Sequence, residues 1–123
     1  MARNAADVVR DFCAAFSRLD VDEVMGYFTD DAVYHNMPAQ PLNGKDAIRQ
    51  AIQAFLGNWS RTQWDILNIA ADGDIVFTER VDRIWAGDKH VDLPIAGVFE
   101  VRDGKIAAWR DYFDMGTYLK AMA

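Results

Sequence analysis

The second half of the chain alternates strand-forming segments with very short connections, and this alternation restricts the fold more than any other feature. The segments rich in β-branched and aromatic residues are 61–70, 75–85, 90–101 and 106–113. Gly73, Gly87 and Gly104 lie in the connections beside aspartate or lysine, a composition that is typical of tight turns. Because short connections join antiparallel strands, residues 61–113 are predicted to form an antiparallel meander.

Helical patterns precede this meander. Asn4 resembles an N-terminal helix cap, and apolar residues recur at helical spacing over residues 9–19. Asp20 repeats the capping pattern and is predicted to begin a short helix that extends as far as Phe28. The chain is therefore expected to start with two helices.

The region between these helices and the meander contains one more strand and one more helix. Residues 29–31 are predicted to form a turn, and residues 32–37 a short strand that prolines bring to an end. A third helix is predicted to begin within residues 43–46 and to end at Gly57. Residues 115–122 are predicted to add one or two helical turns after the meander.

The predicted order of elements, α-α-β-α-β-β-β-β, describes a single α+β domain over residues 1–123. A chain of 123 residues with 51% hydrophobic residues can bury a core of its own. A strongly twisted sheet can curl around a helix and leave a pocket on its concave side, which is the default place for a ligand site.

Composition and motifs exclude several classes of function. The net charge of −6 argues against nucleic acid and anionic membrane surfaces as partners. No apolar run could span a bilayer and no signal-peptide pattern is visible, so a soluble cytoplasmic protein is expected. Cys13 is expected to be packed among apolar helix residues. His35 and His90 have no metal-binding spacing, so no catalytic metal is expected, and phosphate-loop, dinucleotide-binding and nucleophile-elbow motifs are absent.

Acidic residues stand at positions where a β-strand can turn them towards the interior. Strand alternation places Asp111 on the same face as the aromatic residues Trp109 and Phe113. A carboxylate on an interior face has to be hydrogen-bonded or take part in chemistry. On an earlier strand Arg80 and Asp82 share a face, and alternation alone leaves open whether they point inward or form an ion pair in solvent.

Two other strands leave similar alternatives open. Tyr34 and Asn36 share a face of the short strand 32–37, where they either hold a water molecule or serve as ordinary rim and turn residues. Both faces of the segment 90–101 are largely apolar, which fits a central strand between covering helices and either a pocket or a partner subunit. Pro94 predicts a bulge or bend in that strand.

Taken together, these motifs resemble the limonene-1,2-epoxide hydrolase family. The segments that carry the resemblance are Tyr34-His35-Asn36-Met37-Pro38, Thr78-Glu79-Arg80-Val81-Asp82, Leu93-Pro94-Ile95-Ala96-Gly97-Val98-Phe99, Gly104-Lys105-Ile106 and Trp109-Arg110-Asp111-Tyr112-Phe113-Asp114. The resemblance extends from about residue 8 to residue 118, and the helical half is generic for the NTF2-like (SnoaL-like) superfamily. It implies an NTF2-like cone, in which N-terminal helices wrap a strongly curved mixed β-sheet around a deep pocket, and commonly a homodimer.

The resemblance also implies a one-step, cofactor-free hydrolysis of an epoxide to a vicinal diol, without a covalent intermediate. Asp111 would take a proton from a water molecule that Tyr34 and Asn36 hold. Asp82 would protonate the epoxide oxygen, and Arg80 would bridge the two aspartates. This chemistry needs one ionised and one protonated carboxyl group, which a shared, desolvated site favours because two nearby like charges resist ionising together.

If the two aspartates face inward, alternation turns their apolar neighbours inward as well. The expected substrate-binding residues are Ile84, Leu93, Ile95, Trp109 and Phe113. An apolar wall predicts that the substrate, besides water, is a small hydrophobic epoxide of the terpene or cyclic-alkene type. One alternative on the same fold is a proton-shuttle enzyme of the ketosteroid-isomerase or polyketide-cyclase kind, for which one aspartate would face solvent. The other is a non-enzymatic binding module with a filled pocket.

Overall fold

The computed structural model describes residues 4–123, in which helices pack against one β-sheet. In chain order the elements are α1 (Ala5–Ala15), the 3-10 helix η1 (Phe16–Arg18), α2 (Val21–Met25), β1 (Phe28–Asn36), β2 (Leu42–Asn43), α3 (Lys45–Asn58), β3 (Arg61–Asp72), β4 (Ile75–Ala86), β5 (Lys89–Arg102), β6 (Lys105–Tyr112) and α4 (Met115–Met122). The predicted α+β class is confirmed.

The sheet has the strand order β2-β1-β6-β5-β4-β3. Strands β3 to β6 form the predicted antiparallel meander. β1 pairs in parallel with β6, so the sheet is mixed, and this pairing sets Tyr34 opposite Trp109 and Asn36 opposite Asp111. Residues from the two ends of the sequence therefore become neighbours in the middle of the sheet.

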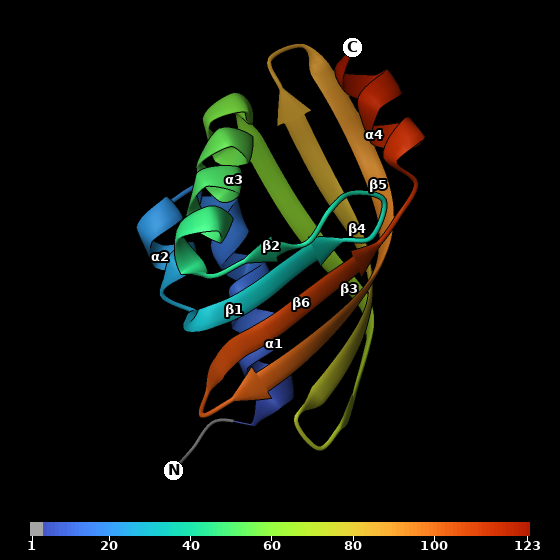
Figure 1. The fold of residues 1–123 in the computed structure, drawn as a ribbon. Coiled ribbons are helices and arrows are strands. Elements are labelled where there is room, and N and C mark those ends of the chain that lie inside the picture. The colour runs from blue at the N-terminus through green and yellow to red at the C-terminus, as the bar shows by residue number, and fades with distance from the viewer. Residues whose placement is uncertain (1–3) are drawn as a thin grey trace.

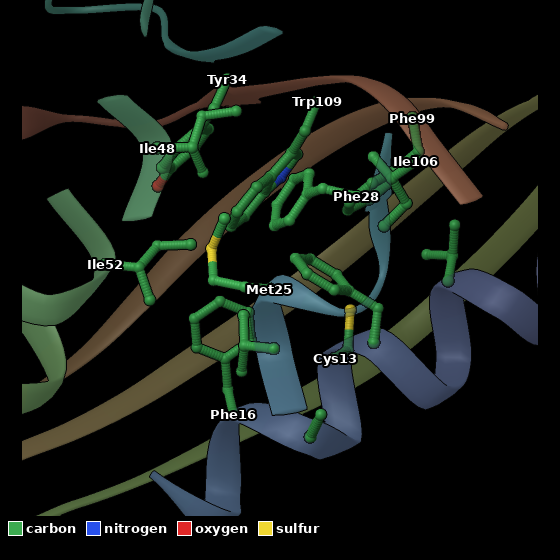
Figure 2. Close-up of a cluster of buried hydrophobic side chains, with 14 of the residues drawn as sticks. Cys13, Phe16, Met25, Phe28, Tyr34, Ile48, Ile52, Phe99, Ile106 and Trp109 are labelled. Carbon is green, nitrogen blue, oxygen red and sulfur yellow. The ribbon is translucent and has the colours of Figure 1, made fainter. Parts of the chain in front are cut away.

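The strongly curved sheet wraps around the N-terminal helices, as Figure 1 shows. Helix α1 packs against strands β3 to β6, and α3 packs against β1. Figure 2 shows Met25, Phe28 and Cys13 gathered near Trp109 between the helices and the sheet. Trp109 and Phe12 are both 0% exposed, and their ring centroids lie 4.9 Å apart in an edge-to-face contact. Cys13 is 1% exposed, which confirms that it is packed in the core.

Polar caps begin the first helices as predicted. The Asn4 side chain accepts a hydrogen bond of 2.8 Å from the Asp7 backbone N–H, ahead of α1. The Asp20 carboxylate accepts one of 3.2 Å from the Glu23 backbone N–H, ahead of α2. Each cap satisfies a backbone donor that the first turn of a helix leaves without an intrahelical partner.

Three predicted boundaries are wrong. Residues 29–31 lie inside β1 and do not form a turn, because the strand already begins at Phe28, which pairs with Ile106 of β6 across a register irregularity. Phe28 accordingly belongs to the strand and not to α2. Helix α3 begins at Lys45 and continues through Gly57 to Asn58, because the backbone turns to an extended conformation only at the following residue, a tryptophan.

The bulge predicted at Pro94 is absent. The register between β4 and β5 continues without a shift through the pair Val81 and Pro94. Strand β6 pairs with β5 only from Ala96 onward, and α4 contacts β5 instead. Beside Pro94, β5 therefore has a strand neighbour on one edge only, so the missing proline N–H interrupts no second ladder.

Candidate active site

Arg80 lies between two carboxylates that face the interior of the sheet. Its Nε and Nη2 atoms donate to the two oxygens of Asp82, each over 3.0 Å. Its Nη1 and Nη2 atoms donate to Asp111 Oδ1 and Oδ2 over 3.1 and 2.8 Å. The exposed fractions of these three residues are only 1–2% (Arg80 1%, Asp82 2%, Asp111 2%), so a solvent-exposed ion pair is excluded. A planar guanidinium fork of this kind fixes both carboxylates in one geometry.

The register of the meander brings this group together. Across β4, β5 and β6, Thr78 pairs with Gly97, and Gly97 pairs with Asp111. Because Gly97 has no side chain, the guanidinium of Arg80 crosses the strand at this point. A Cβ atom on residue 97 would lie 2.7 Å from Asp111 Oδ1 and would also contact Arg80 Nη1 directly. Glycine at this position of β5 therefore leaves the space in which Arg80 of β4 reaches Asp111 of β6.

Neighbouring side chains satisfy the remaining hydrogen-bonding groups of the cluster. Arg80 Nη1 also donates to Thr78 Oγ1 over 3.2 Å, and the Trp109 indole Nε1 donates to Asp111 Oδ1 over 2.7 Å. The Arg80 guanidinium lies 4.9 Å from the ring centroid of Trp64, a cation–π contact. Within residues 4–123 no buried side-chain nitrogen or oxygen atom lacks a partner. The carboxylates are thus held in place before any ligand binds.

Burial and charge shift the proton affinities of the site in ways that suit acid–base chemistry. Burial raises the pKa of Asp82 to about 6, because the attraction of Arg80 offsets only part of the desolvation and the Asp111 charge adds to it. Burial, reinforced by the Asp111 charge, raises the pKa of Tyr34 far above its ordinary range. Burial acts against the Arg80 charge, but the two carboxylates outweigh it and raise the pKa of the guanidinium. Tyr34 therefore keeps its proton and can donate a hydrogen bond.

Both carboxylates open onto a cavity of about 70 Å³. Its polar lining residues are Asp82, Asp111, Tyr34 and Asn36. The remaining lining residues are apolar or aromatic: Phe16, Ile52, Phe55, Trp59, Trp64, Ile84, Leu93, Ile95, Phe113, Met115 and Tyr118. A few convergent polar groups in an apolar cavity are the usual composition of a small-molecule site.

Most of the predicted site residues meet at this cavity. Four of the five predicted wall residues line it, namely Ile84, Leu93, Ile95 and Phe113. Trp109, the fifth, is fully buried and is not among the lining residues. It stacks on the ring of Tyr34 at a centroid distance of 3.9 Å. Tyr34 lies between Trp109 and the cavity. Strand alternation therefore predicts the face of β6 on which Trp109 lies, but not its separation from the cavity.

The sequence did not identify the half of the wall that the helices and β3 supply. Phe16, Ile52 and Phe55 belong to amphipathic helices, where an apolar stripe looks the same whether it packs in a core or lines a cavity. Trp64 is paired with Asp82 across β3 and β4, and alternation along β3 could have identified it. The Trp59 indole N–H donates to the hydroxyl of Tyr118 over 3.1 Å and joins the residue that follows α3 to α4.

Comparisons with known proteins agree with this geometry. The sequence matches the model of the limonene-1,2-epoxide hydrolase catalytic domain over residues 3–123. The chain belongs to the limonene-1,2-epoxide hydrolase family. It is 35% identical over 114 residues to epoxide hydrolase EphG of Mycobacterium tuberculosis, which covers 93% of this chain and 76% of EphG. The expected family is thereby confirmed.

Solved structures place this hydrolase-family chain within a wider group of folds. The structure of an M. tuberculosis LEH-like epoxide hydrolase superposes with a TM-score of 0.84 at 35% identity, over 95% of this chain and 87% of that one. An NTF2-like protein of unknown function from Burkholderia pseudomallei superposes with a TM-score of 0.85 at 17% identity, over 98% of both chains. The second likeness shows the fold alone and confirms the NTF2-like architecture.

Among residues 4–123, no group of three or more histidine, cysteine, aspartate or glutamate side chains could hold a metal ion. In the same part of the chain, none of the helices is long and apolar enough to cross a membrane.

Proposed function

We propose that this member of the family hydrolyses a small hydrophobic epoxide to a vicinal diol by general acid–base catalysis in a single step. The observation that carries the proposal is the pair of buried carboxylates, Asp82 and Asp111, held by one guanidinium and lining a largely apolar cavity. Together with Arg80 the pair has a net charge near zero when one proton is shared between the acids. Such a pair titrates as a unit and can hold one acid and one base at the same time.

In this mechanism a water molecule lies between Tyr34, Asn36 and Asp111. Asp111 takes one proton from the water while the water oxygen forms a bond to an epoxide carbon. The bond from that carbon to the ring oxygen breaks, and Asp82 gives its proton to the oxygen as it leaves. The product is a diol with inversion at the attacked carbon, and transfer of a proton from Asp111 to Asp82 restores the starting state. Holding the water between three polar groups lowers the entropy cost of attack.

The cavity supports a compact substrate without charged groups. Its volume of about 70 Å³ is below the roughly 300–1,000 Å³ of typical ligand pockets. A small ring such as cyclohexene oxide suits this space best. A larger terpene oxide requires displacement of the rim residues Met115 and Tyr118 on α4, a helix that has no buried residue. The proposed substrate class is therefore cyclic-alkene oxides, with terpene oxides as the larger members.

A single-turnover experiment tests the proposal. Purified protein in excess over cyclohexene oxide reacts in ¹⁸O-water. The reaction is quenched after one turnover, and the diol is analysed by mass spectrometry. Direct attack by water places one ¹⁸O atom in the diol during the first turnover. A covalent ester route places an unlabelled carboxylate oxygen there instead, which would contradict the one-step mechanism. Absence of diol from a panel of cyclic and terpene epoxides would contradict the function itself.

Neither alternative on this fold is favoured by the site. A proton shuttle with one catalytic aspartate has no need of the second carboxylate, yet Asp82 and Asp111 are both 2% exposed and share Arg80. A closed binding module does not account for a cavity whose wall includes both carboxylates. A hydrolytic acid–base pair uses all of these features.

The rate of hydrolysis is expected to fall as the pH rises above about 6, because the proposed acid Asp82 then loses its proton. Values of kcat/KM measured over roughly pH 4–9 should show this basic limb, declining about tenfold per pH unit. A rate that rises as the pH passes through about 6 would contradict Asp82 as the acid.

The same pKa has a consequence for stability. The pKa of Asp82 in the folded protein is raised from 3.8, so its contribution to stability is complete below pH 3.8 and is lost as the pH rises through about 6.

We also propose that a second copy of the chain covers the outer face of the sheet. Phe77 on β4 and Tyr112 on β6 are 48% and 45% exposed, and Ile75, two residues before Phe77 on β4, is 39% exposed. Large apolar side chains gathered on one open face mark an interaction surface. Light scattering should give the mass of a dimer for the native chain and of a monomer for Phe77→Glu. The matched control Leu119→Glu changes an exposed residue of α4 and should remain dimeric; a monomeric native chain would contradict the proposal.

A further inference from the structure

The two carboxylates of the site accept different numbers of hydrogen bonds. Asp82 accepts two, both from Arg80, one on each oxygen. Asp111 accepts three, two from Arg80 and one from the indole N–H of Trp109. The bond from the indole, at 2.7 Å, is the shortest of these. The indole of Trp109 is therefore what distinguishes the surroundings of the two acids.

The indole of Trp109 favours the ionised form of the carboxylate that it contacts. An indole N–H is a donor and never an acceptor, so it stabilises a bare carboxylate oxygen and offers nothing to a carboxylic acid proton. Asp111 Oδ1 accepts from both Trp109 and Arg80, which leaves little room for a proton on that oxygen. Asp111 Oδ2 and each oxygen of Asp82 accept a single bond, so Asp111 has one such oxygen and Asp82 has two. Hydrogen bonds to the charged form favour that form.

Packing holds the indole in this position. Trp109 is 0% exposed, and its ring stacks on Phe99 at a centroid distance of 5.8 Å and meets the edge of Phe12 at 4.9 Å. The same ring lies almost parallel to that of Tyr34, at 3.9 Å and 8°. The parallel register of β1 and β6 sets these two residues opposite each other. One side chain thus contacts both the proposed base and the proposed water-holding phenol.

We propose that Trp109 is a positioning residue whose indole N–H keeps the shared proton of the acid pair on Asp82 and the negative charge on Asp111. Its ring also supports Tyr34, so the water-holding group and the base stay aligned. This inference rests on the proposed hydrolase function, which gives the two acids their separate roles. Trp109 is not among the residues that line the cavity, and it acts through Asp111 and Tyr34.

The variant Trp109→Phe tests this role, because it keeps an aromatic ring beside Tyr34 and removes the N–H donor. We expect kcat to fall about tenfold or more while KM changes less than about twofold, since substrate contacts are unaltered. The acid limb of the pH–kcat profile should also move to higher pH, because the acid pair loses a donor to its charged form. Adding more substrate is expected to restore neither kcat nor the position of the acid limb.

The matched control is Trp85→Phe, which makes the same change in a tryptophan stacked on His90, away from the acid pair. Its rate and pH profile should equal those of the native protein. A Trp109→Phe variant that is folded and keeps the native pH profile would overturn the proposal, whatever its rate, because a merely structural role lowers activity without moving the limb.

A measurement on the native protein covers the case in which Trp109→Phe fails to fold. In ¹H–¹⁵N spectra of the native chain, the Trp109 indole resonance should lie far downfield and titrate with the acid pair. It is assigned by elimination with Trp59→Phe, Trp64→Phe and Trp85→Phe. An indole resonance at an ordinary shift that ignores pH would overturn the proposal. This readout needs no substrate, so failure of the epoxide panel and failure of the Trp109 role are separate results.

Discussion

Replacing Asp82 by asparagine is expected to lower kcat on the order of 10²–10⁴-fold, the range that a positioned general acid contributes. Asparagine has nearly the shape of the protonated acid but cannot give a proton to the leaving oxygen. Its amide nitrogen also cannot accept a bond from Arg80, which now donates to both Asp82 oxygens over 3.0 Å. Loss of that bond in the interior should reduce the free energy of unfolding by about 1–3 kcal/mol.

The companion variant Asp111→Asn should be at least as inactive, for a different reason. It removes the proposed base, and it also removes a charge that adds to the effect of burial on the pKa of Asp82. No carboxylate then remains beside the water to take its proton. Steady-state kinetics with urea unfolding would measure both effects, and full activity in either variant would contradict the assigned roles. Changing both aspartates together leaves Arg80 buried without a counter-ion and should cost roughly 3–5 kcal/mol of stability.

The acid side of this site could be predicted from the sequence because strand periodicity is a strong local rule. Alternation puts Arg80 and Asp82 on the same face, and it put Asp111 on the same face as Phe113, as the structure shows. Alternation could not decide which face of the segment 75–85 is internal, since both of its faces carry charged residues. Resemblance to a known family made that decision, and the exposed fractions of 1% and 2% confirm it.

Long-range pairing explains the parts that could not be predicted. Nothing local in residues 28–36 indicates that β1 pairs in parallel with the last strand, yet this pairing brings Asn36 opposite Asp111. Residues 29–31 lie within β1 against their turn-like composition, between the paired residues Phe28 and Val33. The hydrogen bond between Trp59, which follows α3, and Tyr118 of α4 depends on tertiary packing, and no helical periodicity encodes it.

Gly97→Ala is expected to abolish turnover and to destabilise the fold, although it adds only a methyl group. The new Cβ would lie 2.7 Å from Asp111 Oδ1 and 3.0 Å from Thr78 Oγ1, and it would collide with Arg80 Nη1. The guanidinium cannot move aside, because its Nε, Nη1 and Nη2 atoms are all hydrogen-bonded and it is only 1% exposed. Overpacking of this kind typically costs about 1–3 kcal/mol, and a shift of the guanidinium separates the two acids.

Gly57→Ala makes the same chemical change where the structure predicts the opposite sign. Gly57 lies near the end of α3, and a Cβ there would meet nothing within 4 Å. Alanine favours a helix over glycine by up to about 1 kcal/mol, so this variant should be as active as the native protein and equally or more stable. The free energy of unfolding in urea and kcat should be measured for Gly97→Ala and Gly57→Ala side by side. If Gly97→Ala retained native activity, Arg80 would not need the gap at residue 97, and the two carboxylates would not depend on it for their alignment.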